Sequence, residues 1–229
     1  MRMVDKIVIH FQRLVATRSL KLALKDVVGL VGRRIKPVHD PEEYLETYMD
    51  SSGMAFIDVG AAIGMWTLFM ANKNVQCYSF EPSPIAFKIL ETVTRKYKNI
   101  KVYQYALGMN DFIAYLNVHS HPGYDSILYK SKEFLRRVPV EVKTLDSFAF
   151  KDVGLIKIDT EGYEVPILIG AVDTIKQNKP RLIIEVHFPF DVEQSAITDL
   201  LISYGYGWTV KYKANGQPHI IADWKGYKP

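Results

Sequence analysis

The sequence predicts an α/β domain built on a doubly wound, mainly parallel β-sheet. Short apolar segments alternate with segments of helical periodicity from residue 54 to residue 204, the pattern of a parallel sheet covered by helices. A turn of small residues, Gly60 to Gly64, joins the first strand to the first helix. The chain of 229 residues is 48% hydrophobic and 24% charged, which suits one core with appendages.

The elements of this sheet follow in order along the chain. The expected buried strands lie at 54–59, 75–80, 100–105, 155–158 and 181–186. The expected helices lie at 63–72, 84–98, 164–177 and 193–204.

Two further pairs of strands complete the domain. Segments 112–118 and 138–142 are rich in β-forming residues and flank a polar loop, which we interpret as an insertion near the site. Strands at 208–213 and 219–222 are joined by Asn215-Gly216, a pair that favours a tight hairpin. The sheet is therefore expected to end in an antiparallel pair.

The N-terminal segment differs from the rest in charge. Residues 1–36 hold nine basic and two acidic residues, a charge of +7. Because the net charge of the whole chain is +4, the remaining residues carry −3. Apolar residues at helical spacing predict two amphipathic helices here. We divide the chain into an N-terminal amphipathic helical extension and linker, 1–52, and a main domain, 53–229. The favoured interpretation packs the helices on the main domain or on a second subunit of a homo-oligomer; the alternative is contact with a membrane surface or a lipid-linked acceptor.

Composition excludes several classes of protein. Cys77 is the single cysteine and lies in an apolar stretch, which predicts a buried thiol and no disulfide or zinc site. The chain has no apolar run of about 18 residues and no signal-peptide pattern, which predicts a cytoplasmic protein, peripheral at the membrane if the basic helices bind there. No basic motif interleaved with aromatic residues favours a nucleic-acid partner.

The strand that ends at Asp58 and the turn behind it form the most informative motif. Its spacing, G-x-x-x-G, lacks the third glycine of a dinucleotide site, and Asp58 would disfavour a nearby phosphate but attract a cationic amino group. Glu81 follows 23 residues later, near the offset of about 20 at which an acid meets ribose hydroxyls. An adenosine carrying an amino acid satisfies both acids, and S-adenosylmethionine is such a molecule. The turn residues placed beside it are Gly60, Ala61, Ala62 and Gly64.

Several motifs in fixed order resemble those of FkbM-type methyltransferases over about residues 54–190. They are DVGAAIG from Asp58, FEPSP from Phe80, ALG from Ala106, TLDSF from Thr144, LIKIDTEGYE from Leu155, LIGA from Leu168 and IEVH from Ile184. The resemblance implies a Rossmann-like class I methyltransferase fold with a seven-stranded sheet whose last strand is antiparallel. It also implies S-adenosylmethionine as cofactor and methylation of a hydroxyl on a sugar or natural product. One departure is Ala62, where the family usually has asparagine.

Polar residues at two strand ends are the candidate catalytic group. Strand alternation puts Lys157 and Asp159 on one face, with Glu161 in the loop that follows. Glu185 and His187 share a face at the end of the next strand, so the four acidic and histidine side chains converge if the two strands are neighbours.

Two chemical interpretations compete for this group, beside a structural one. In the favoured one Asp159 or His187 accepts the hydroxyl proton without a metal, and Lys157 keeps a carboxylate ionised. In the other, Asp159, Glu185 and His187 bind a divalent metal. The structural alternative is a buried Lys157–Glu185 pair that only stiffens the sheet, with His187 capping a turn before Pro189.

Weaker signals complete the hypothesis of an O-methyltransferase acting on a small-molecule or glycan acceptor. Ser126 or Tyr124 is placed to close over the adenosine or the acceptor, and Pro82, Tyr105 and Ala106 to line the cofactor. The rival hypotheses are an N-methyltransferase of protein or RNA, for which the usual Asn/Asp-Pro-Pro-Tyr/Phe motif is missing, and a cofactor-binding assembly module without catalysis.

Overall fold

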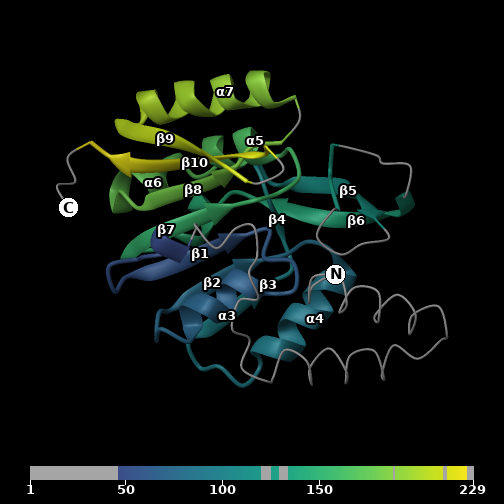
Figure 1. Cartoon of the computed structure of the whole chain (residues 1–229). Helices are drawn as coiled ribbons and strands as arrows, with labels where there is room; N and C mark the ends of the chain where they lie inside the picture. The colour runs from purple at the N-terminus through teal and green to yellow at the C-terminus, as the bar shows by residue number, and fades with distance from the viewer. Residues whose placement is uncertain (1–45, 120–124, 129–133, 188, 214–215, 226–229) are drawn as a thin grey trace.

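The computed structural model describes residues 46–119, 125–128, 134–187, 189–213 and 216–225 (Figure 1). The predicted N-terminal helices, Tyr124 and Asn215 lie outside these residues.

The main sheet has seven strands. They are β1 (Ala55–Val59), β2 (Cys77–Phe80), β3 (Ile100–Tyr103), β7 (Val153–Ile158), β8 (Arg181–Glu185), β9 (Tyr206–Tyr212) and β10 (Pro218–Trp224). Their order is β3-β2-β1-β7-β8-β10-β9, and the neighbours from β3 to β8 pair in parallel. The last strand, β10, runs antiparallel to both of its neighbours. The predicted sheet, including its antiparallel end, is confirmed.

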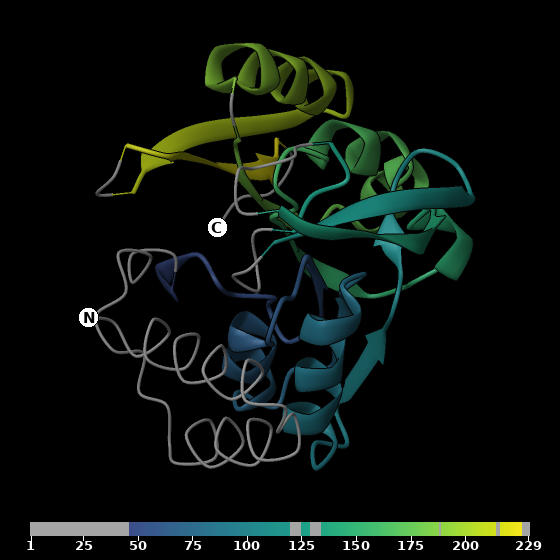
Figure 2. The same ribbon diagram turned by 90° about the vertical axis from the view of Figure 1, so that its right-hand side faces the viewer.

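A second, smaller sheet stands beside the first. Its strands are β4 (Ala106–Leu107), β5 (Phe112–His119) and β6 (Phe134–Lys143), in the order β4-β6-β5. In both views β5 and β6 form a ribbon apart from the main sheet (Figures 1 and 2). The strand predicted at 100–105 therefore ends early, at Tyr103, and the chain crosses to the small sheet at Ala106.

Helices cover both faces of the main sheet, as a doubly wound fold requires. They are α3 (Met65–Ala71), α4 (Pro84–Thr94), α5 (Glu164–Ile169), α6 (Val172–Asn178) and α7 (Phe190–Ser203), with the short 3₁₀ helix η2 (Asp146–Phe148). Side chains of β1 alternate between two core clusters: Phe56 packs with Met70 of α3, whereas Ile57 packs in the cluster that contains Ile167 of α5 and Ile197 of α7.

One predicted helix, 164–177, is broken into α5 and α6. The break lies at Gly170, where a Cβ atom would come within 2.0 Å of the backbone oxygen of Gly108. The two backbones meet too closely for any side chain, so this position between the two helices requires glycine.

Two predictions from composition can be compared with the described residues. Cys77 is buried and free, and burial raises the pKa of its thiol to about 12, which confirms an inert core cysteine. None of the helices described has both the length and the apolar composition needed to cross a membrane.

Candidate active site

A pocket opens at the carboxyl ends of β1, β2 and β7, beside the small sheet. Six of the predicted cofactor residues line it: Gly60, Ala62, Glu81, Pro82, Tyr105 and Ala106. Asp159 and Glu161, from the catalytic group, line the same pocket. The walls also include residues that the motifs did not single out, among them Leu116, Asp125, Ile127, Thr160 and Tyr163.

The carboxylate of Glu81 organises one wall. Its Oε2 accepts the N–H of Ala62 at 2.8 Å, and its Oε1 accepts the N–H of Ser83 at 2.8 Å. The residue is only 6% exposed, and burial raises its pKa to about 8 although both backbone hydrogen bonds act in the opposite direction. Glu81 thus ties the turn after β1 to the loop after β2.

The glycines of the turn after β1 let neighbouring segments pack closely against it. A Cβ at Gly60, which has φ +78°, would lie 1.8 Å from the backbone oxygen of Asp159, so glycine alone lets the loop after β7 approach the turn. A Cβ at Gly64 would meet Leu90 of α4 at 2.7 Å. Gly64 is absent from the described pocket lining, as is Ala61, whose N–H bonds the oxygen of Phe80.

The structure places Asp58 behind the turn, away from the described pocket wall. It is 1% exposed, and its Oδ2 accepts the hydroxyl of Thr67 at 2.6 Å, which in turn bonds Ser79 at 2.8 Å. Burial raises its pKa. In this structure Asp58 therefore ties β1 to α3 and β2 and does not reach into the pocket as the motif predicted.

Ser126 also stands one step back from the pocket. Its hydroxyl donates to the backbone oxygen of Glu161 at 2.8 Å, while its neighbours Asp125 and Ile127 form the wall. Ser126 thus supports the loop that carries Glu161.

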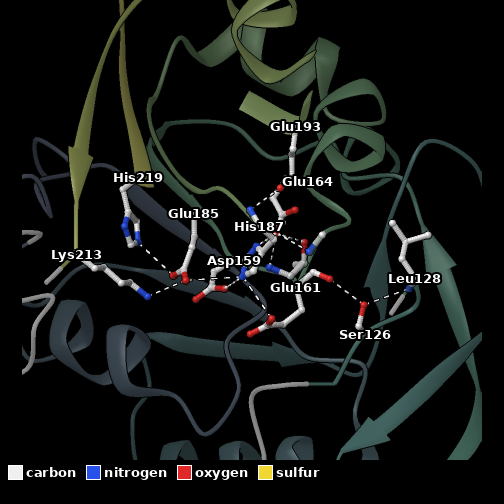
Figure 3. Close-up of polar contacts among 12 residues, drawn as sticks. Ser126, Leu128, Asp159, Glu161, Glu164, Glu185, His187, Glu193, Lys213 and His219 are labelled. Carbon is white, nitrogen blue, oxygen red and sulfur yellow. Dashed lines mark hydrogen bonds and ion pairs between the residues drawn. The ribbon is translucent and has the colours of Figure 1, made fainter. Parts of the chain in front are cut away.

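The predicted convergence at the catalytic edge is confirmed (Figure 3). His187 Nε2 lies 3.4 Å from Glu161 Oε2, 3.7 Å from Asp159 Oδ1 and 3.7 Å from Glu185 Oε1. Lys157 Nζ lies 3.0 Å from Asp159 Oδ2. Strands β7 and β8 are parallel neighbours, which is why these side chains meet.

Two glutamates of this cluster escaped sequence reasoning. Glu164 Oε1 accepts the N–H and hydroxyl of Thr160, the N–H of Gly162 and, at 3.0 Å, Nδ1–H of His187. Glu193, on α7, accepts the backbone N–H of His187. For Glu164 the sequence did contain a signal, its E-x-x-E spacing from Glu161. For Glu193 the sequence contained no such signal.

The ion pairs described for Lys157 and Glu185 are with other residues. Lys157 pairs with Asp159, whereas Glu185 pairs with Lys213 at 2.7 Å and lies 3.2 Å from Nε2 of His219. Lys213 and His219 belong to the C-terminal hairpin, whose residues the motifs did not include.

Charges in the cluster set the protonation of its members. Burial raises the pKa of Asp159, but Lys157 and then His187 outweigh it and hold that pKa below its usual range. Burial lowers the pKa of His187, but the hydrogen bond to Glu164 and the nearby carboxylates raise it to about 10. Burial raises the pKa of Glu161 to about 8. Asp159 is therefore ionised at neutral pH.

Comparison with known proteins agrees with this architecture. Residues 58–207 match the family described as Methyltransferase FkbM domain. Methyltransferase 1 of Beauveria bassiana (strain ARSEF 2860) is 28% identical in an alignment 144 residues long that covers 51% of this chain and 58% of that protein. The chain thus matches less than two thirds of the length of this curated relative.

Solved structures give the class of fold. The methyltransferase FkbM from Methylobacillus flagellatus KT superposes with a TM-score of 0.57 at 20% identity, over 73% of this chain and 43% of that one. SMU.1697c from Streptococcus mutans, solved in complex with SAH, superposes with a TM-score of 0.51 at 14% identity. The match covers 81% of this chain and 97% of that one. The fold is that of class I methyltransferases. Because the family match covers more than half of the sequence, the chain belongs to the FkbM methyltransferase family.

The pKa of Glu81 predicts a pH dependence of stability. Its folded-state pKa of about 8 lies above the ordinary 4.5, so the folded state binds more protons and the contribution of Glu81 to stability falls as pH rises from about 4.5 to 8. We expect Glu81→Gln to remove part of this fall, on the order of 2 kcal/mol. Urea unfolding of wild type and variant at pH 5, 6.5 and 8 measures it, and parallel pH profiles would contradict the burial of Glu81.

Proposed function

We propose that this protein transfers a methyl group from S-adenosylmethionine to a hydroxyl of a sugar, glycan or natural-product-like acceptor. The observation that carries the proposal is one pocket whose wall joins Glu81 and the small-residue turn to Asp159 and Glu161. A carboxylate suited to ribose and a group able to take a proton thus share one space. Membership of a methyltransferase family supports this use of the pocket.

The cofactor half of the pocket suits an adenosine. Glu81 stands at the end of the second strand, where an acid can accept ribose hydroxyls. Pro82, Tyr105 and Ala106 offer apolar and aromatic surface for a base. The turn at Gly60 and Ala62 leaves a backbone surface for the amino-acid part of the cofactor.

The other half suits the chemistry of methyl transfer to an alcohol. The acceptor oxygen forms a bond to the methyl carbon in line with the carbon–sulfur bond, whose electron pair stays on sulfur as S-adenosylhomocysteine leaves. The hydroxyl proton passes to the carboxylate of Asp159, the ionised acid that faces the pocket. Lys157 supports this role because it holds Asp159 ionised.

Calorimetric titration with S-adenosylmethionine and S-adenosylhomocysteine tests the cofactor. We expect saturable binding by wild type and binding about 10-fold weaker in Glu81→Ala, because the hydrogen bonds from both ribose hydroxyls would be lost, at about 0.5–1.5 kcal/mol each. Glu91→Ala is the matched control: Glu91 is an exposed glutamate of α4 paired only to Lys88 among the ion pairs described. No binding of either compound by wild type would overturn the proposal.

Substitution of Asp159 tests the catalytic half. Asp159→Asn should lower turnover by about 10²–10⁴, the range for loss of a general base, and leave the affinity for S-adenosylhomocysteine unchanged. Release of S-adenosylhomocysteine with a panel of glycan acceptors measures turnover. Asp111→Asn, which removes an exposed acid paired with Lys143, is the control. Wild-type turnover in Asp159→Asn would remove this residue from the mechanism.

A further inference from the structure

The ring nitrogen Nε2 of His187 has a position that hydrogen bonding does not explain. The residue is 6% exposed, and Nε2 is buried without a hydrogen-bond partner. The atom faces two carboxylates of the pocket wall, Glu161 at 3.4 Å and Asp159 at 3.7 Å, and also lies 3.7 Å from Glu185 Oε1 (Figure 3). The 3.7 Å contact to Asp159 is too long to be a hydrogen bond, and the 3.4 Å contact to Glu161 does not form one either. A buried nitrogen without a hydrogen-bond partner costs free energy.

The separations fit three ligands arranged around a cation. Protein nitrogen and oxygen ligands lie about 2.0–2.2 Å from a transition-metal ion, so at octahedral or tetrahedral angles they lie about 3.0–3.6 Å from one another. The ligand atoms of Asp159, Glu161 and His187 all lie within 4.8 Å of one another, and Nε2 lies close to the expected spacing from both oxygens.

The surroundings of the three side chains fix them in the way that metal ligands are fixed. A histidine that binds a metal usually donates its other ring N–H to a carboxylate, which sets the tautomer and aims the ring. His187 Nδ1 meets Glu164 Oε1 at 3.0 Å, and that oxygen already accepts backbone N–H groups, so Nδ1 must be the donor. Lys157 binds Oδ2 of Asp159 and leaves Oδ1 on the side of His187.

We propose that Asp159, Glu161 and His187 bind one divalent first-row cation, with Mn²⁺ as the representative ion. The proposal deepens the proposed function, because an ion held at the pocket wall by three protein ligands keeps open positions for the acceptor oxygen. Bound there, a cation stabilises the oxyanion form of a hydroxyl. The ligand set differs from the one considered from sequence, since Glu161 replaces Glu185, whose Oε1 is already paired with Lys213.

The other candidate set, Glu164, His187 and Glu193, does not offer the same site. It would use Nδ1 of His187, which is already committed to Glu164. All three of its side chains are buried, so it has no open side for a substrate.

Titration of the full chain with Mn²⁺ tests the proposal without cofactor or turnover. Binding is measured as the decrease of the free-ion signal in electron paramagnetic resonance. We expect saturable binding of one ion by wild type, lost in Glu161→Gln and His187→Gln. Glu164→Gln should weaken binding about 10- to 100-fold, because it changes only the support of the histidine. Glu185→Gln and the exposed-acid variant Asp111→Asn should retain saturable binding.

Calorimetry with S-adenosylhomocysteine on the same preparations separates the two proposals and shows that each variant is folded. No saturable Mn²⁺ binding by wild type that binds S-adenosylhomocysteine would overturn the metal site and leave metal-free base catalysis. Binding that survives in both Glu161→Gln and His187→Gln would also overturn it. If wild type binds Mn²⁺ but not S-adenosylhomocysteine, circular dichroism shows whether the two variants are folded. Mn²⁺ binding lost in folded variants then supports the site, and the proposed function alone falls.

Discussion

Oε1 of Glu164 accepts hydrogen bonds from two segments that would otherwise be independent. It receives the backbone N–H of Thr160, in the loop after β7, and Nδ1–H of His187, beyond the end of β8. Glu164 has no exposed surface, so removal of this acceptor would leave buried donors unsatisfied at about 1–3 kcal/mol each. The loop that carries Asp159 and Glu161 is thereby held against His187, and the pocket wall depends on this link.

The pocket wall also contains backbone strain that its neighbours hold in place. Ala62 and Glu161 have φ values of 48° and 55°, the left-handed region that costs a non-glycine residue about 1–2 kcal/mol. The N–H of Ala62 is bound by Glu81, and the oxygen of Glu161 is bound by Ser126. Strain that is retained beside a cavity is typical of preorganised sites. Both strained residues line the pocket, one in each half.

The parallel strands could be predicted from the sequence because apolar periodicity is local. The convergence at their carboxyl ends followed only on the condition that β7 and β8 are neighbours, which the structure supplies. Glu81, Asp159 and His187 each follow such a strand. The place of Lys213 in the cluster could not be predicted, because it depends on how the C-terminal hairpin pairs with β8. The need for glycine at position 170 was equally hidden, because the contact that requires it comes from a backbone 62 residues earlier, at Gly108. The motif predicted Asp58 beside the cofactor. In the structure its carboxylate accepts a hydrogen bond from Thr67.

In the proposed function one pocket holds the cofactor between Glu81 and the cluster of Asp159, Glu161 and His187. A crystal structure of the protein with S-adenosylhomocysteine is the most direct test. We expect the ribose hydroxyls on the carboxylate of Glu81, the adenine beside Tyr105, and the sulfur facing Asp159 and Glu161. S-adenosylhomocysteine bound elsewhere, or bound with its sulfur turned away from these carboxylates, would contradict the proposed function.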